Sequence, residues 1–139
     1  MVELANAMVL LLLGGMLFFP VVVAPIVFTS LPELEAGQFL RSMFPRYYLF
    51  MIFFSALAFG FYQSAAGAEV TIAAAVCLLV ALSTIWVRQS LVPRINDARD
   101  AQLAGDADAA AKFDRGHKLS VAINTLQLVG LIAILFVQA

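Results

Sequence analysis

Charged residues are scarce in this sequence. Only 12% of the 139 residues are Asp, Glu, Lys or Arg, against about 25% in an average soluble domain. A small soluble domain has a large surface to cover with polar groups, and this chain has too few of them. The formal net charge of -1 gives no positive surface for nucleic acid. The single cysteine, Cys77, excludes an intrachain disulfide.

Apolar residues are abundant instead. They make up 63% of the chain, and the mean hydropathy is +0.98. They form four uncharged blocks near the length of about 20 residues that crosses a bilayer, without the alternation of β-strands. We therefore predict an all-α integral membrane four-helix bundle, a single domain covering 1–139. Its expected spans are residues 4–30, 47–66, 70–90 and 116–138. The first lacks a basic leader and a cleavage site, so we expect it to be retained.

The positions of the cations predict the orientation of the bundle. All eight Lys and Arg residues lie in or beside two segments, 31–46 and 91–115. The positive-inside rule places both segments in the cytoplasm and both termini outside. The expected location is the bacterial inner membrane, and the expected partner is the lipid bilayer.

Both basic segments are predicted to be helical. The pattern Ser30-Leu31-Pro32-Glu33 is typical of a capping box, and residues 31–46 then form a short amphipathic helix on the membrane surface. We expect Pro45 to end this helix. Segment 91–115 is expected to be a cytoplasmic helical extension. Gly105-Asp106 should interrupt it, with Asp106 capping a new helix from the next residue.

Small residues and prolines suggest how the spans pack. Small side chains recur at every fourth position and let two helices approach closely. They are Ala56, Gly60 and Ser64 on the second span and Ala73, Cys77 and Ala81 on the third. We therefore expect these two spans to form a close antiparallel hairpin. In the first span, Pro20 and Pro25 predict a kinked helix; the alternative is a broken helix that offers carbonyls to a ligand.

A polar stripe on the fourth span gives the main candidate site. Its spacing places the side chains within an arc of about 80° on one helix face. The stripe reaches about 15 Å inward from the cytoplasmic interface. Its members are His117, Ser120, Asn124 and Gln127. Polar groups in hydrocarbon are costly unless paired. The stripe therefore either binds a ligand or makes hydrogen bonds that set the register between helices.

Three arginines near the mouth of the stripe extend the candidate site. They are Arg88, Arg94 and Arg46. Guanidinium groups match carboxylates and phosphates, so these side chains could hold an anion. General attraction to anionic lipid is the alternative, and Arg94 has a possible local partner in Asp97. For Arg99, Lys112 and Lys118 we expect lipid attraction alone.

His117 is the only histidine. We expect it to make hydrogen bonds at the mouth of the stripe. Ligation of haem or a metal is the alternative. No metal site or cofactor is predicted, since neither a second histidine nor a suitably spaced carboxylate accompanies it. No catalytic residue is assigned, because phosphate loops, dinucleotide glycine patterns and serine elbows are absent. The chain is thus more consistent with a non-enzymatic protein, although this stays open.

Three short blocks make the chain resemble the transmembrane-protein-205-like family. They are Phe28-x-Ser30-Leu31-Pro32 with Gly37 and Phe44-Pro45-x-Tyr47, then Leu91-x-Pro93-Arg94, then Phe113-x-x-x-His117-x-x-Ser120-x-x-x-Asn124. The resemblance implies four transmembrane helices and an undefined biochemical role. It points to the same residues as the polar stripe and the arginines. The connection between the third and fourth spans is shorter here than in animal members.

These observations lead to three hypotheses about function. The first is a membrane protein that binds or passes a small polar or anionic ligand at a cytoplasm-facing cleft beside the fourth span. The second is a structural or accessory subunit of a larger membrane complex, or of a homo-oligomer. The third is a haem- or metal-associated protein that uses His117.

Overall fold

The structure is a computed structural model that describes residues 1–138. Helices account for every regular element in this range, which confirms the all-α class. In chain order the elements are α1 (Val2–Phe18), the π-helical turn η1 (Phe19–Val23), α2 (Ala24–Ser30), α3 (Glu33–Gln63), α4 (Ala68–Trp86), the π-helical turn η2 (Val87–Leu91), α5 (Val92–Leu103) and α6 (Ala109–Gln138). Residue 139, the last of the predicted domain, lies outside the described residues.

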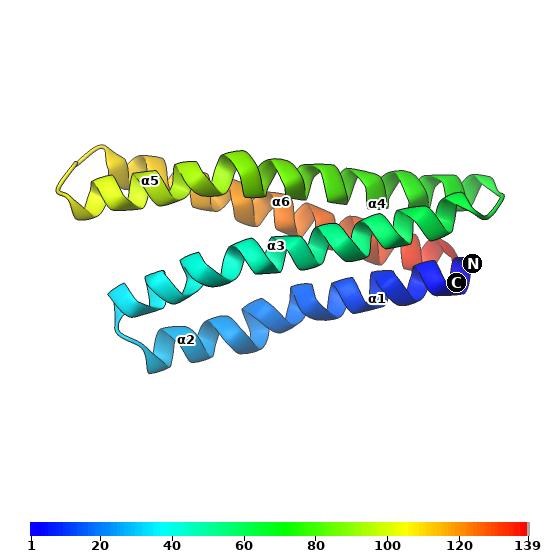
Figure 1. Ribbon diagram of the computed structural model, residues 1–139, viewed down its shortest axis with the longest axis horizontal. Helices are drawn as coiled ribbons and strands as arrows, with labels where there is room; N and C mark the ends of the chain where they lie inside the picture. The colour runs from blue at the N-terminus through cyan, green and yellow to red at the C-terminus, as the bar shows by residue number, and fades with distance from the viewer. Residues whose placement is uncertain (139) are drawn as a thin grey trace.

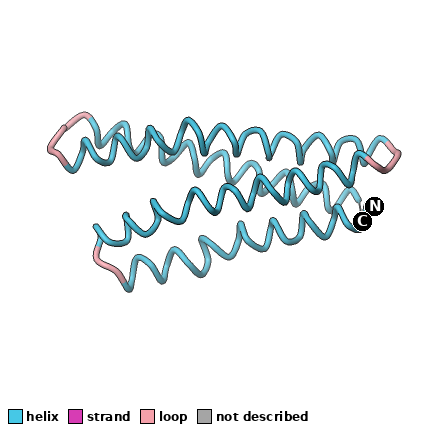
Figure 2. The backbone as a smooth tube through the Cα atoms, in the orientation of Figure 1, coloured by secondary structure: helices cyan, strands magenta, loops and turns pink. Residues whose placement is uncertain are grey.

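The helices form two antiparallel hairpins side by side (Figure 1). In the first, the continuous rod α1–η1–α2 returns through α3, and in the second, the rod α4–η2–α5 returns through α6. Helix α3 packs on α1 and α4, while α6 packs on α4, α5 and α1. We call the end that holds the turns at 31–32 and 104–108 the tip end. The start of α1, the end of α6 and the α3–α4 turn lie at the opposite end, and the loops of the described chain are confined to the two ends (Figure 2).

Four of these helical rods are long and apolar enough to cross a membrane. They are Val2–Ser30, Glu33–Gln63, Ala68–Leu103 and Ala109–Val137. Large apolar side chains cover the outside of the bundle, including Leu126 at 74% and Phe136 at 80% exposure. A soluble protein would bury such side chains, whereas lipid solvates them. The chain is therefore a four-helix membrane protein.

The predicted surface helix over 31–46 is helical, but it is not a separate element. Helix α3 runs without a break from Glu33 to Gln63, with Pro45 inside it. A proline within a helix leaves the carbonyl four residues before it, here that of Arg41, without its usual donor. The next carbonyl, that of Ser42, accepts a hydrogen bond from the Arg46 guanidinium at 2.8 Å. The predicted capping box is wrong, because α3 begins after Pro32 and has no side-chain cap.

The first rod, α1–η1–α2, also stays helical throughout, although it contains Pro20 and Pro25. The π turn η1 precedes Pro25, and within it the Ala24 amide donates to the carbonyl oxygen of Phe19, five residues back. The second rod is built alike: η2 precedes Pro93, and the Val92 amide donates to Val87. A π turn absorbs the misfit of a proline ring without opening the helix. The rod Val2–Ser30 is unbroken, so the alternative of a broken helix at Pro20 and Pro25 is not observed.

The core contains one of the two predicted small-residue stripes. Ala73, Cys77 and Ala81 on α4 are buried, as expected. The stripe of Ala56, Gly60 and Ser64 on α3 is exposed, so that part of the prediction is wrong. Instead α3 buries an adjacent face, comprising Met51, Ser55, Ala58 and Tyr62. The Tyr62 hydroxyl donates to the Asn6 side chain in α1, a pairing that the exposed face would not allow.

Glycine shapes the two longer turns. Gly67 between α3 and α4 has φ +137°, and Gly105 between α5 and α6 has φ +97°. These values favour glycine because a Cβ atom would clash with the backbone. The Asp106 carboxylate then accepts a hydrogen bond from the Asp108 amide at 2.9 Å. Asp106 therefore precedes a new helix as predicted, but α6 begins at Ala109, two residues later than expected.

The contact between α5 and α6 gives a test of the packing. A Cβ atom on Gly116 would lie 2.8 Å from Ile95 Cγ1, whereas one on Gly130, in the same helix, would meet only Val76 at 3.5 Å. We expect Gly116→Ala to destabilise the protein by about 1–3 kcal/mol through overpacking. Gly130→Ala should be tolerated. Thermal unfolding in detergent measures both, and equal melting temperatures for the two variants would contradict this close approach.

Candidate functional site

The inner part of the predicted stripe joins α6 to α4. Gln127 is buried, and its Nε2 donates to the Ser83 hydroxyl at 2.8 Å and to the Thr84 hydroxyl at 3.1 Å. A buried amide in a membrane interior needs such partners. The Ser83 hydroxyl in turn donates to the carbonyl oxygen of Leu79. This part of the stripe sets the register between two neighbouring helices.

The next residue of the stripe reaches across the bundle to α3. Asn124 Nδ2 donates to the Tyr47 hydroxyl at 3.3 Å and lies 3.6 Å from Met51 Sδ. Helix α3 packs mainly on α1 and α4 rather than on α6. Asn124 therefore adds a side-chain contact between two helices that share little packing surface.

The outer part of the stripe makes only local contacts. The Ser120 hydroxyl donates to the carbonyl oxygen of His117 at 2.7 Å, within its own helix. His117 is exposed, and its ring stacks on Phe113 with 6.0 Å between the centroids. No group of three or more His, Cys, Asp or Glu side chains in residues 1–138 is placed to hold a metal ion. The four predicted residues thus share a face of α6 but differ in their surroundings.

The three predicted arginines do not converge. Arg88 lies in η2, is partly buried, and its Nε donates to the carbonyl oxygen of Pro45 at 3.3 Å. Arg46 is exposed on α3 and bonds only within that helix. Arg94 lines a groove between α5 and α6. The suggested pairing of Arg94 with Asp97 is not observed among the ion pairs of residues 1–138.

An aromatic cluster holds Tyr47 in place. It consists of Phe19 from η1 and Phe44, Tyr47 and Tyr48 from α3, with ring centroids 5.3 to 6.3 Å apart. Aromatic rings at such distances pack edge to face or offset, which restricts their rotation. The Tyr47 hydroxyl is therefore directed at Asn124 by packing against two elements.

Arg88, Tyr47 and Asn124 lie at about the same height in the bundle. Gln127 meets Ser83 and Thr84, and three residues of an antiparallel helix span about 4.5 Å. Asn124 is therefore level with residues 86–87, next to Arg88 in the chain. Arg88 and Tyr47 both belong to this level, because Arg88 contacts Pro45 and Tyr47 contacts Asn124. We call these three residues, from α3, η2 and α6, the polar layer.

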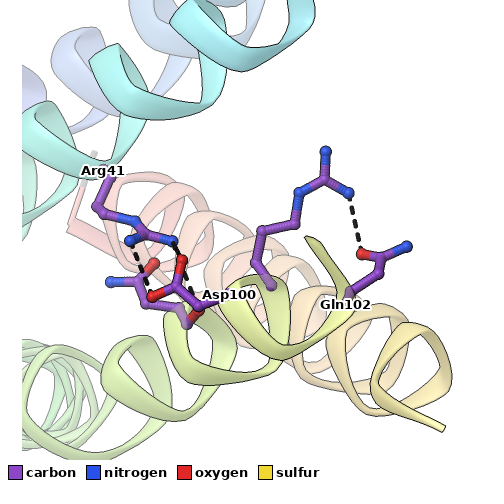
Figure 3. A network of polar contacts seen from close by, with 5 residues as sticks. Arg41, Asp100 and Gln102 are labelled. Carbon is purple, nitrogen blue, oxygen red and sulfur yellow. Dashed lines mark hydrogen bonds and ion pairs between the residues drawn. The ribbon is translucent and has the colours of Figure 1, made fainter. Parts of the chain in front are cut away.

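Two ion pairs join the hairpins at the tip end. The arginine comes from α3 in one pair and from α5 in the other. Arg41 of α3 forms a two-pronged pair with Asp100 of α5, at 2.7 and 3.1 Å (Figure 3). Arg99 of α5 binds Glu33 of α3 at 2.7 Å and lies over the ring of Phe113. The expectation of lipid attraction alone for Arg99 thus missed a specific partner.

These pairs also affect the ionisation of their members. The hydrogen bonds and charge of Arg41 lower the pKa of Asp100 below its ordinary value of 3.8, and the same hydrogen bonds raise the pKa of Arg41. Opposite charges on segments 31–46 and 91–115 are visible in the sequence. Their partners are not, because they lie 59 and 66 residues apart.

Comparison with known families adds one finding. Residues 7–103 match the model of a domain of unknown function, DUF4149. The chain belongs to the DUF4149 family. The DUF4149 match begins within α1 and ends at the last residue of α5. Tyr47 and Arg88 therefore lie within it, and Asn124 lies beyond it. No curated protein and no solved structure matches the chain.

The Arg41–Asp100 pair predicts a pH dependence of stability. A carboxylate whose pKa falls on folding stabilises the protein above the unfolded pKa, and this contribution is lost as the pH falls through the folded value. We therefore expect Asp100→Asn to lower the melting temperature modestly at pH 7 and to match the wild type well below pH 3.8.

The control is Asp108→Asn, which removes an exposed carboxylate that forms no ion pair in the described chain. The exchanged pair Arg41→Asp with Asp100→Arg should recover part of the stability. A difference between wild type and Asp100→Asn that persists unchanged at low pH would show that the ion pair is not its cause.

Proposed function

We propose that this DUF4149 protein binds a small anionic ligand, a carboxylate or phosphate, at the polar layer. The observation that carries the proposal is the environment of Arg88. Its guanidinium is partly buried, yet it forms no ion pair with any carboxylate in residues 1–138. Its only hydrogen bond within this range uses Nε. Four of its five N–H donors thus remain available to a ligand.

Two neutral donors lie at about the height of Arg88. They are the Tyr47 hydroxyl and the Asn124 amide, which suit an oxyanion. A guanidinium with neutral donors beside it is the arrangement that proteins use for carboxylates and phosphates. Arg88 also lies in a π turn, and such turns are frequent at functional sites. A ligand oxygen would replace the hydrogen bond between Asn124 and Tyr47 with bonds from both.

The proposed location is the bacterial inner membrane, with the tip end in the cytoplasm. Support comes from the cations, because all eight lie at or near the tip end and none is found beside the termini or Gly67. The ligand would then enter from the cytoplasmic side. Passage of the ligand across the membrane belongs to the same hypothesis.

The two alternative functions remain proposals. A role as an accessory subunit or homo-oligomer is favoured by the exposed face of Ala56, Gly60 and Ser64, which would let another helix approach closely. A haem- or metal-associated role would use His117, which is exposed at the tip end.

A relationship with the transmembrane-protein-205-like family is also a proposal. Two of the three blocks that carry the resemblance, those around Pro45 and Pro93, lie within residues 7–103. The third, from Phe113 to Asn124, lies outside them. The polar layer draws one residue from the first block and one from the third.

Binding at the polar layer is testable through Trp86, the only tryptophan, two residues from Arg88. We expect phosphate or a short-chain carboxylate to change Trp86 fluorescence saturably in purified protein. Arg88→Gln and Asn124→Leu should weaken this binding roughly tenfold or more, the loss of a charge-assisted hydrogen bond. Native mass spectrometry of gently extracted protein should show a bound anion, oligomer or partner directly.

The matched control is Arg46→Gln, which removes an exposed arginine that bonds only within α3. It should bind as the wild type does. If Asn124→Leu reduces expression and melting temperature without a specific loss of binding, Asn124 sets helix register only, and the proposed ligand site is refuted.

The orientation has a separate test in a Cys77→Ala background, because Cys77 is the only native thiol and is buried. We expect a membrane-impermeant maleimide to label Ala66→Cys, at the α3–α4 turn, in intact spheroplasts. Ala104→Cys, in the tip-end loop, should react only after permeabilisation. Both positions are exposed. The reverse labelling pattern would place the tip end outside the cell.

A further inference from the structure

A groove of about 480 Å³ lies between α5 and α6. Small residues form much of its wall, among them Ala98 and Ala101 of α5 and Ala109 and Gly116 of α6. The short side chains of the alanines leave space between the helices, whereas Gly116 lies directly against Ile95. Its lining is mainly apolar, but charged side chains stand along it.

The charges in the groove are of both signs. Arg94 and Lys112 are positive, and Asp97 and Asp106 are negative. All four are exposed, and none of them takes part in an ion pair in the described chain. By contrast, Arg41, Arg99 and Asp100 on the neighbouring surfaces are all paired. The groove therefore offers both signs of charge to a ligand that carries both.

The groove begins close to the membrane. One end is lined by Leu91, only three residues beyond Arg88 on the same rod, and the other end reaches the loop residue Asp106. Trp86, whose exposed amphipathic ring is typical of a membrane interface, lies just before η2. Along α5 from the membrane, Arg94 comes first and Asp97 follows about 4.5 Å farther out.

We propose that this groove binds the headgroup of a zwitterionic phospholipid that carries a phosphate and a primary ammonium. The phosphate of such a lipid is attached next to the glycerol and so lies nearer the hydrocarbon than the ammonium. Arg94, at the membrane-proximal end, meets the phosphate, and Asp97, one turn farther out, meets the ammonium. Lys112 and Asp106 continue the same alternation of charge.

This lipid site is distinct from the polar layer. Arg88 is directed at α3, where it bonds to Pro45, whereas Arg94 faces the groove between α5 and α6. Lipid binding in the groove therefore does not depend on the proposed ligand of Arg88. A lipid bound here would cover the apolar wall of the groove between α5 and α6. It would also attach these two helices to the membrane surface.

The test is native mass spectrometry of the full-length protein from micelles that contain equal amounts of phosphatidylethanolamine and phosphatidylglycerol. We expect the wild type to retain phosphatidylethanolamine in preference. Arg94→Gln should reduce retention of both lipids, since both have a phosphate. Asp97→Asn should remove the preference alone, lowering retained phosphatidylethanolamine roughly tenfold, as loss of a charge-assisted hydrogen bond implies.

Two controls separate the groove from general electrostatics. Arg115→Gln removes an exposed arginine of α6 that does not line the groove and bonds only to its own helix, so lipid retention should stay unchanged. Ala98→Leu fills the groove without altering any charge and should abolish retention. This variant keeps the proposal testable if a charge variant fails to fold.

Equal retention of the two lipids by the wild type would overturn the proposal, since it would indicate attraction to the phosphate alone. Unchanged retention in Ala98→Leu would place any bound lipid elsewhere. Arg88→Gln should keep its phosphatidylethanolamine, so failure of the polar-layer site and failure of the lipid site are distinguishable.

Discussion

A backbone in hydrocarbon has no water to satisfy its N–H and C=O groups, and this constraint governs the whole structure. It explains why Pro20 and Pro25 are carried in a continuous rod within the first span. At η1 the Ala24 amide, just before Pro25, shifts to the carbonyl five residues back. Serine and threonine hydroxyls obey the same constraint, as when Ser55 donates to the carbonyl oxygen of Met51.

Once the backbone is satisfied, the few remaining polar side chains decide how the two hairpins meet. Gln127 fixes α6 against α4 within the second hairpin, whereas Asn124 reaches Tyr47 of the first hairpin across the bundle. At the tip end the Arg41–Asp100 pair joins α3 to α5. The hairpins are therefore joined by polar contacts at several heights. Exposed charged side chains that form no ion pair in the described chain, such as Arg94 and Asp97, line the groove near the tip end, where we propose that a lipid headgroup binds.

Much of the fold followed from composition and pattern. The four uncharged blocks predicted the spans, since nothing but a helix buries such a block in lipid. The errors came from local rules that apply in water. A proline such as Pro45 often ends a helix, but here α3 continues through it, and the rings of Phe44 and Tyr48 stack on either side of it. Small residues permit close packing on either face of α3, so their spacing alone could not reveal which face is buried.

The sequence by itself determined that the chain is a helical membrane protein, that its cations lie at one end, and that four polar residues share a face of α6. Only the tertiary structure decided which of them have partners. Asn124 and Tyr47 are 77 residues apart, and no pattern of local spacing connects them. The same applies to Arg88 and Arg94, which are close in sequence but serve different surfaces, because Arg88 bonds to Pro45 of α3 whereas Arg94 lines the groove between α5 and α6. The periodicity of the sequence shows which residues share a face of one helix, whereas a site is formed where the faces of several helices meet.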